Sequence, residues 1–202
     1  MSAQERLEHN STVEDLRTIV GQYEGDDDAH FELIEGEIVQ MHPPGAQHGY
    51  LAVKLARVFD AHVTKNHLGI VTVETGYIIR RSGYKDSVLA PDVAFTSQYK
   101  SPDALPEGYI PFPPDLAIEI KSPNDTTKKL RRKTRIYLTG GARVVLNVYP
   151  FEGIEICRPA EGRGVNIEFI EMEGVLDIED VLPGFQLAVK DIFYEPDGSS
   201  SG

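Results

Sequence analysis

The sequence predicts a mixed α/β (α+β) fold in which helices flank a mixed sheet. Residues 116–120 have the apolar density of a buried strand and are bounded by turn residues. Residues 70–79 alternate in polarity and are rich in β-branched side chains, as in a strand. Residues 47–66 carry apolar side chains at helical spacing instead. Strands and helices therefore share one fold.

The composition favours one domain in a reducing compartment. The chain has 202 residues, of which 41% are hydrophobic, and this is enough for one well-buried core. It has a single cysteine, no apolar leader and no run of eighteen apolar residues, so we expect a cytoplasmic protein without a membrane span. Glycine-rich phosphate loops are absent, so no nucleotide cofactor is expected.

The first third of the chain is predicted to form a helix, a hairpin and the longer helix at 47–66. Apolar residues at helical spacing predict a short helix within residues 1–21, followed by a loop at 26–30. Residues 31–41 contain two short apolar runs broken at Glu35-Gly36, which is the pattern of a β-hairpin.

The middle of the chain is predicted to hold two strands and a long loop. The strands are expected at 70–79 and 88–95, and the second of them carries Asp92. The proline-rich loop at 96–114 is too long for a simple connection. It either reads a substrate or covers an edge of the sheet.

The central strand at 116–120 leads into a helix. Ser122-Pro123 stops the strand, and Asp125 or Asn124 is expected to cap the helix that follows. That helix is expected to bury one face and to end at Gly140-Gly141, before a strand at 143–148.

The last third of the chain is predicted to form a hairpin and an apolar tail. The hairpin strands are expected at 154–157 and 165–172, and the segment up to Phe193 is expected to dock on the core. We therefore expect a helix and acidic loop at 1–30, a single domain at 31–193 and a flexible tail at 194–202.

Three charged residues in the predicted strands suggest a site. Glu119 and Lys121 lie two residues apart in an apolar strand, so their side chains leave the same face. Asp92 stands at the start of another short apolar run. Buried charges are costly unless they are paired or used, and one divalent cation shared by Asp92 and Glu119 beside Lys121 would use them. Alternatively, Glu119 and Lys121 form a structural ion pair and Asp92 caps a turn.

The charge distribution is uneven. The formal net charge of −12 argues against a nucleic-acid partner in bulk electrostatic terms. Basic residues nevertheless gather directly after the Glu119 strand, where they form either a solvated helix face or a substrate-binding surface. The members of this basic cluster are Lys128, Lys129, Arg131, Arg132, Lys133 and Arg135.

Two further residues allow alternative interpretations. Lys133 lies on the apolar stripe of its helix with Tyr137, so it either snorkels to the rim or points toward the carboxylates. His48 is either an ordinary core histidine or part of the same site.

The order helix, strand, strand, strand, helix, strand resembles the PD-(D/E)XK nuclease superfamily and, more narrowly, the Uma-two family of restriction-endonuclease-like proteins. The resemblance extends from about Phe31 to Phe193. It rests on the motifs Glu35-Gly36-Glu37, His48, Ala90-Pro91-Asp92-Val93, Glu119-Ile120-Lys121-Ser122-Pro123, Lys133 with Tyr137, and Pro183-Gly184-Phe185.

This resemblance implies a restriction-endonuclease-like core with an N-terminal hairpin and a C-terminal β elaboration. It implies an endonuclease that cuts DNA with Mg²⁺ or Mn²⁺ and forms a homodimer. The implied catalytic residues are Asp92, Glu119, Lys121, Glu35 and His48, with Asp92 and Glu119 as metal ligands. Glu35 and His48 substitute for an acidic residue that the superfamily often carries on its first core helix.

The implied substrate-binding residues are Lys128, Arg131, Arg132, Lys133 and Tyr137. The alternative is a module that keeps the nuclease scaffold and binds nucleic acid or protein without catalysis.

Overall fold

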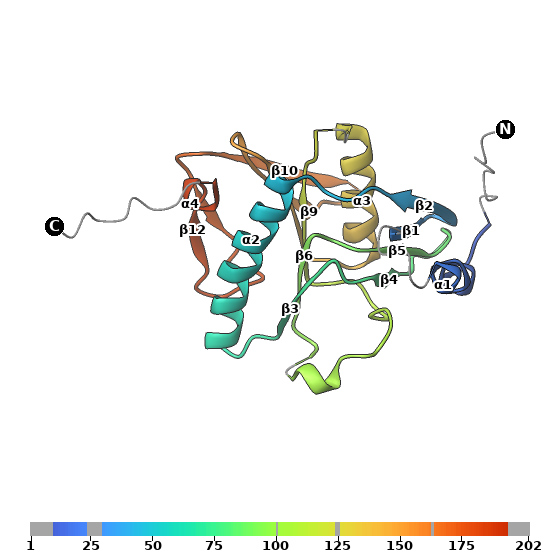
Figure 1. Cartoon of the computed structure of the whole chain (residues 1–202). Coiled ribbons are helices and arrows are strands. Elements are labelled where there is room, and N and C mark those ends of the chain that lie inside the picture. The colour runs from blue at the N-terminus through green and yellow to red at the C-terminus, as the bar shows by residue number, and fades with distance from the viewer. Residues whose placement is uncertain (1–9, 24–29, 100, 124–125, 163, 194–202) are drawn as a thin grey trace.

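The protein is built around a six-stranded mixed sheet (Figure 1). The structure is a computed structural model that describes residues 10–23, 30–99, 101–123, 126–162 and 164–193. The strand order is β10-β9-β8-β7-β6-β3, with β7 and β8 parallel and the other neighbours antiparallel. The strands are β3 (Ile70–Val73), β6 (Val93–Thr96), β7 (Leu116–Ile120), β8 (Val144–Tyr149), β9 (Gly153–Pro159) and β10 (Val165–Glu171).

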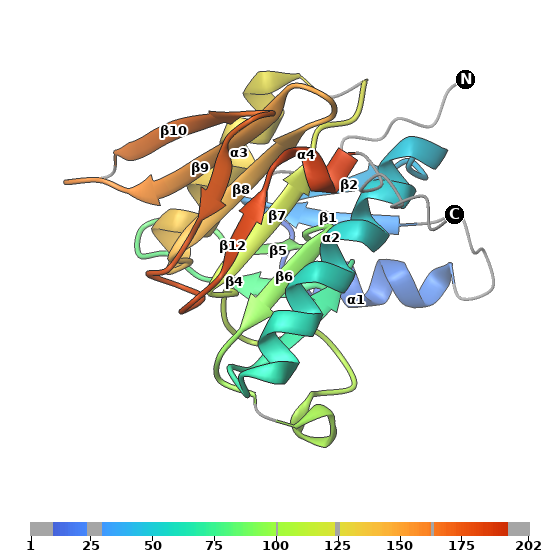
Figure 2. The same ribbon diagram turned by 90° about the vertical axis from the view of Figure 1, so that its left-hand side faces the viewer.

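One face of this sheet is covered by α2 (Ala46–Lys65) and the C-terminal segment (Figure 2). Phe59 of α2 stacks on Phe185, with ring centroids 4.6 Å apart. The apolar tail therefore docks on the core, as predicted. Its elements are β11 (Val175–Asp177), β12 (Gln186–Ala188) and α4 (Lys190–Phe193).

The opposite face is covered by α3 (Thr127–Gly140), which lies between the large sheet and a second, four-stranded sheet. Tyr137 of α3 is buried in one cluster with Ala117 of the large sheet and Leu89 of the small one. The small sheet has the order β2-β1-β5-β4 and consists of β1 (His30–Ile34), β2 (Glu37–Met41), β4 (Tyr77–Ile79) and β5 (Ser87–Leu89).

The outer face of the small sheet is covered by α1 (Val13–Gln22), whose Leu16 is buried against Leu33. Figure 1 shows the resulting layers: α2, large sheet, α3, small sheet, α1. The loop between β6 and β7 contains a short 3₁₀ helix, η1 (Pro102–Ala104). No helix among the described residues is long and apolar enough to cross a membrane.

Two predicted strands are in fact two strands each. The segment 70–79 divides into β3 and β4, because Glu74 takes a left-handed φ of 44° between them. The segment 88–95 divides into β5 and β6 at Ala90-Pro91-Asp92, where Pro91 has no N–H for a ladder. In both cases the chain crosses from one sheet to the other. The second crossing places Asp92 at the junction of the two sheets.

Helix boundaries differ from the prediction at two N-termini. α1 begins only at Val13, with Thr12 and Asp15 forming a capping box. α3 is capped by Thr126, whose side chain accepts from the Lys129 N–H, so the predicted cap at Asn124 or Asp125 was wrong.

Other predicted boundaries are confirmed. The hairpin turn at Glu35-Gly36 has both φ angles positive, at 54° and 80°, as a two-residue type I′ turn requires. α3 ends at Gly140 with Gly141 as its cap. Residues 1–9, 124–125 and the predicted tail at 194–202 lie outside the described residues, as does most of the loop predicted at 26–30, whose last residue, His30, begins β1.

Candidate active site

Asp92 and Glu119 come together where β6 begins and β7 ends. Val93 pairs with Ile118 in the antiparallel ladder, so the residues next to this pair, Asp92 and Glu119, share the α3 side of the sheet. Asp92 Oδ2 accepts a hydrogen bond of 2.6 Å from the Ile120 N–H, which fixes it against β7.

Glu119 is a buried carboxyl group with 6% of its surface exposed. Its Oε1 accepts a 2.8 Å hydrogen bond from the Tyr137 hydroxyl, and Lys133 Nζ lies 3.3 Å from its Oε2. Burial raises the pKa of Glu119 to about 8 against the pull of the Lys133 ammonium, and the nearby Asp92 carboxylate adds to the rise. Glu119 therefore holds a proton much more readily than an exposed glutamate.

Lys133 also contacts Glu32, which comes from β1 of the small sheet. The Lys133 Nζ to Glu32 Oε1 distance is 2.9 Å, and the same oxygen accepts from the Ala90 N–H at 3.0 Å. Burial alone would lower the pKa of Lys133, but the carboxylates of Glu119 and Glu32 raise it instead. Lys133 thus points toward the carboxylates, as one of the two interpretations predicted, and does not snorkel to the rim.

His48 extends this cluster from the first turn of α2. Its Nε2 lies 3.2 Å from Asp92 Oδ2. The hydrogen bond with Asp92 raises the pKa of His48, and burial opposes this shift. The Ile120 carbonyl beside the ring raises it further. His48 is therefore part of the polar site and not an ordinary core histidine.

Glu35 is not brought to these residues. Its carboxylate pairs with Arg81 at 2.8 Å and Arg132 at 2.9 Å beside the hairpin turn. Burial would raise the pKa of Glu35, but Arg81 and Arg132 together lower it. The hairpin residue that enters the site is Glu32, which the sequence analysis missed. Its signal was a charge inside the apolar run of β1, the same pattern that singled out Glu119.

Lys121 follows β7 directly, on the same side as Glu119 by strand alternation. Its N–H donates to the Val148 carbonyl at 2.9 Å, so the backbone there is still held by β8. The side chain is half-buried, and no carboxylate of a described residue lies within ion-pair distance of it. The cationic partner of Glu119 is Lys133, so a Glu119–Lys121 ion pair is not what the structure contains.

Most of the predicted substrate-binding residues are paired with carboxylates or buried, and only some remain exposed to a substrate. Arg131 pairs with Glu155 at 2.5 Å, Arg132 pairs with Glu35, and Lys133 is internal. Tyr137 is fully buried, and its hydroxyl donates to Glu119. A substrate therefore cannot contact Tyr137. The exposed members of the basic cluster are Lys128, Lys129, Arg132 and Arg135, and of these Arg132 is held by Glu35.

The donor set of this corner fits a small divalent cation. The carboxylates of Asp92 and Glu119 and the Ile120 carbonyl are hard oxygen ligands, and Glu32 Oε2 is a buried oxygen without a hydrogen-bond partner among the described residues. Within those residues no group of three or more His, Cys, Asp or Glu side chains is arranged to hold a metal. A metal here would therefore be bound by two carboxylates, with the Ile120 carbonyl and water as its remaining ligands. Mg²⁺ is commonly bound in this way, by one or two carboxylates and several waters.

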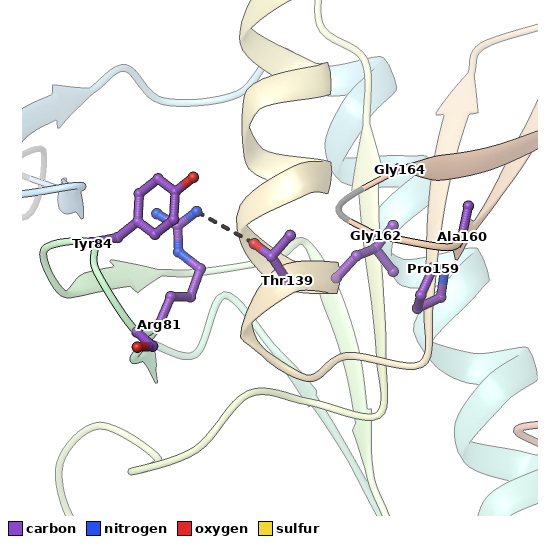
Figure 3. A pocket seen from close by; sticks show the side chains of 9 residues that line it. Arg81, Tyr84, Thr139, Pro159, Ala160, Gly162 and Gly164 are labelled. Atoms are coloured by element: carbon purple, nitrogen blue, oxygen red, sulfur yellow. Dashed lines mark hydrogen bonds between the residues drawn. The ribbon is translucent and has the colours of Figure 1, made fainter.

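A separate cavity of about 330 Å³ lies at the other end of α3 (Figure 3). In it the Arg81 guanidinium lies 4.3 Å from the Tyr84 ring centroid and donates to Thr139. None of the described residues that line it carries a carboxylate. This cavity lacks the ligands that the Asp92 corner provides.

Comparisons with known proteins identify the family and the fold of the chain. The family Uma2, described as "Putative restriction endonuclease", matches residues 14–190. A crystal structure described as a "putative nuclease belonging to DUF820" from Anabaena variabilis ATCC 29413 has the same fold, with a TM-score of 0.65 and 23% identity. The match covers 82% of this chain and 90% of that one. No curated protein matches the chain. Because the family match spans most of the sequence, the chain belongs to the Uma2 family of restriction-endonuclease-like proteins.

Proposed function

We propose that this protein is a nuclease that hydrolyses phosphodiester bonds in DNA with the help of Mg²⁺ or Mn²⁺. The observation that carries the proposal is the meeting of Asp92 and Glu119 on adjacent strands, held together by the bond from the Ile120 N–H to Asp92. Membership of the Uma2 family supports it.

In this proposal the cation is held by Asp92, Glu119 and the Ile120 carbonyl. When bound, it supplies charge stabilisation at the phosphoryl oxygens and makes water more acidic. Lys121 lies beside these ligands and is not engaged by a carboxylate of any described residue. Its ammonium orients the attacking water or donates to the scissile phosphate as negative charge develops there.

The surrounding residues position the two carboxylates. His48 holds Asp92, while Tyr137 and Lys133 each hold one oxygen of Glu119. Glu32 in turn fixes Lys133. We assign Glu35 to a structural role, because its carboxylate braces Arg81 and Arg132 away from this corner.

The DNA backbone is expected to contact the exposed cations of α3 next to the site, chiefly Lys128 and Lys129. Arg131 and Arg132 present guanidinium groups that Glu155 and Glu35 already orient. A homodimer and a cytoplasmic location belong to the same proposal. The homodimer rests on the family resemblance alone, and the cytoplasmic location rests on the single cysteine.

One observation favours a second candidate, a non-catalytic nucleic-acid-binding module. Both oxygens of Glu119 are engaged by protein groups, and the Lys133 ammonium supplies a positive charge beside them. In this candidate Lys133 supplies the positive charge that a metal would otherwise bring to Glu119, and the scaffold alone serves binding.

A cleavage assay separates the two candidates. Duplex, single-stranded and branched DNA are incubated with the full chain and Mg²⁺ or Mn²⁺. Cleavage that EDTA stops, and that Glu119→Gln abolishes, supports the nuclease. Survival of every substrate at saturating cation, with DNA binding retained, would favour the non-catalytic module.

A further inference from the structure

A groove lies between α3 and β10, on the same face of the large sheet as the candidate active site. It encloses a cavity of about 300 Å³, the lower end of the range for sites that bind small organic groups. β10 is the edge strand of the large sheet (Figure 2). The cavity is lined by Arg131, Thr134 and Arg135 of α3 and by Gly164, Val165 and Ile167 at β10.

The β10 wall of the groove is apolar. Val165, Ile167 and Phe169 alternate along the strand, so they share one face. Ile167 is 40% exposed and Phe169 is 47% exposed, a large apolar surface for an edge strand. The Phe169 ring meets Tyr149 edge-on, with centroids 6.1 Å apart. A side chain at Gly153 would come within 2.8 Å of the Phe169 ring, so the glycine leaves room for it.

The α3 wall is basic. Arg131 and Arg135 are one turn apart, about 6 Å along the helix axis, which is comparable with the separation of successive phosphates in a strand. Arg131 is held by Glu155, which accepts in turn from Asn147 at 3.1 Å, and its Nε has no acceptor among the described residues. No carboxylate of a described residue lies within ion-pair distance of the exposed Arg135.

One row of side chains, buried beneath α3, separates the groove from the active site. The strand registers align Glu119 with Asn147, Asn147 with Glu155, and Glu155 with Phe169. Three strand spacings separate the ends of this row, or about 14 Å. Tyr149 leaves the same face two residues after Asn147, beside the β7 end that carries Lys121. A strand that leaves the groove past the partly exposed Tyr149 therefore has only a few nucleotides to span before the proposed metal ligands.

We propose that this groove binds a single DNA strand next to the scissile bond. The phosphates lie along Arg131 and Arg135, and the bases stack on or pack against Tyr149, Phe169 and Ile167. A single strand fits both walls because it exposes base faces as well as phosphates, whereas a duplex hides the faces. The charge of the α3 wall argues against an apolar protein partner, since that partner would cover Arg135 without an acceptor. The inference rests on the proposed nuclease function for its substrate class.

The test is a binding measurement without metal, so that cleavage plays no part. Fluorescence anisotropy of the full chain in EDTA follows labelled oligothymidylate, a DNA hairpin duplex and oligouridylate. Phe169→Ala should weaken oligothymidylate binding at least about fivefold and leave duplex binding nearly unchanged. Ile167→Glu should weaken it too, because a carboxylate beside Arg131 repels phosphate. Arg131→Gln should reduce the slope of log affinity against log salt by about 0.7.

Tyr84→Ala is the matched control. Tyr84 is another exposed aromatic that stacks on an arginine, Arg81, but at the other end of α3 (Figure 3). Its loss should leave binding of every oligonucleotide unchanged.

Three outcomes would overturn the inference. The wild type could fail to bind oligothymidylate or bind only oligouridylate. Phe169→Ala and Ile167→Glu could both bind oligothymidylate like the wild type. The two variants could instead convert a dimer to a monomer in sedimentation with strand binding intact, which would make the groove a contact between two copies. None of these outcomes bears on metal-dependent cleavage, which the cleavage assay measures separately.

Discussion

The Lys133 ammonium lies 2.9 Å from a Glu32 carboxylate oxygen, although the two residues are 101 positions apart in the sequence. This contact joins α3 to the small sheet. The same ammonium neutralises Glu119 of the large sheet, so one buried cation connects both sheets. The Lys133 side chain is only 14% exposed, so little water can reach Glu32 and Glu119 to solvate them in its place.

Removing this charge should destabilise the protein strongly. Lys133→Met keeps the length of the side chain but leaves Glu32 and Glu119 buried without a cation. A loss of about 3–5 kcal/mol in the free energy of unfolding is expected at pH 7, as when one partner of a buried pair is removed. Urea denaturation measures it. Lys129→Met, on the exposed side of the same helix, should change stability by less than about 0.5 kcal/mol.

Lys121→Ala should separate chemistry from structure. Lys121 is half-buried and is not a metal ligand in the proposal, so folding and cation binding should remain. Cleavage should fall by roughly a hundredfold or more, the scale of losing one preorganised donor to the transition state. Single-turnover rates at saturating Mn²⁺, together with a Mn²⁺ titration, provide both readouts. An unchanged cleavage rate would remove Lys121 from the mechanism.

Asp92→Asn should abolish cation binding and cleavage together. The amide oxygen can still accept from the Ile120 N–H, so the backbone contact that Asp92 makes is preserved. The substitution also removes a negative charge beside Glu119, so the melting temperature without metal should be equal to or above that of the wild type. Calorimetric titration and thermal denaturation test these expectations. Tight Mn²⁺ binding by the variant would show that Asp92 is not a ligand.

Glu35→Gln should reduce stability with a defined pH dependence. Arg81 and Arg132 lower the pKa of Glu35 in the folded state below its ordinary 4.5, against the effect of burial. A lowered pKa gives stability that is fully present above 4.5 and is lost as pH falls through the folded value. The wild type should exceed the variant by about 1–3 kcal/mol at pH 7. This difference should be constant down to about pH 5 and shrink below it. DNA cleavage at pH 7 should persist, because Glu35 lies outside the proposed site.

The elements that the sequence predicted best are those with a strong local signal. The period of Leu51, Leu55 and Phe59 defined α2, and the apolar run at 116–120 defined β7. The two strands were misjudged because β-branched residues stand on both sides of the breaks at 74–76 and 90–92. Only the sheet partners, which are distant in sequence, show that the chain changes sheets there.

The sequence predicted only those site residues that lie in a local pattern. Asp92 and Glu119 stand in short motifs, the spacing of Glu119 and Lys121 indicates a shared face, and Lys133 lies on an apolar helix stripe. Glu32 reaches the site only because the small sheet packs against α3, which no local pattern encodes. The recognisable hairpin turn therefore pointed to Glu35 and not to the buried Glu32 of the same hairpin.

The most direct measurement is a crystal structure with Mn²⁺ bound and its anomalous signal recorded. The expected result is one strong peak within about 2.0–2.3 Å of oxygens from Asp92, Glu119 and the Ile120 carbonyl, with Lys121 facing the same ion. A site without an anomalous peak at saturating Mn²⁺, with Glu119 still bonded to Lys133 and Tyr137, would contradict a metal-dependent nuclease at this corner.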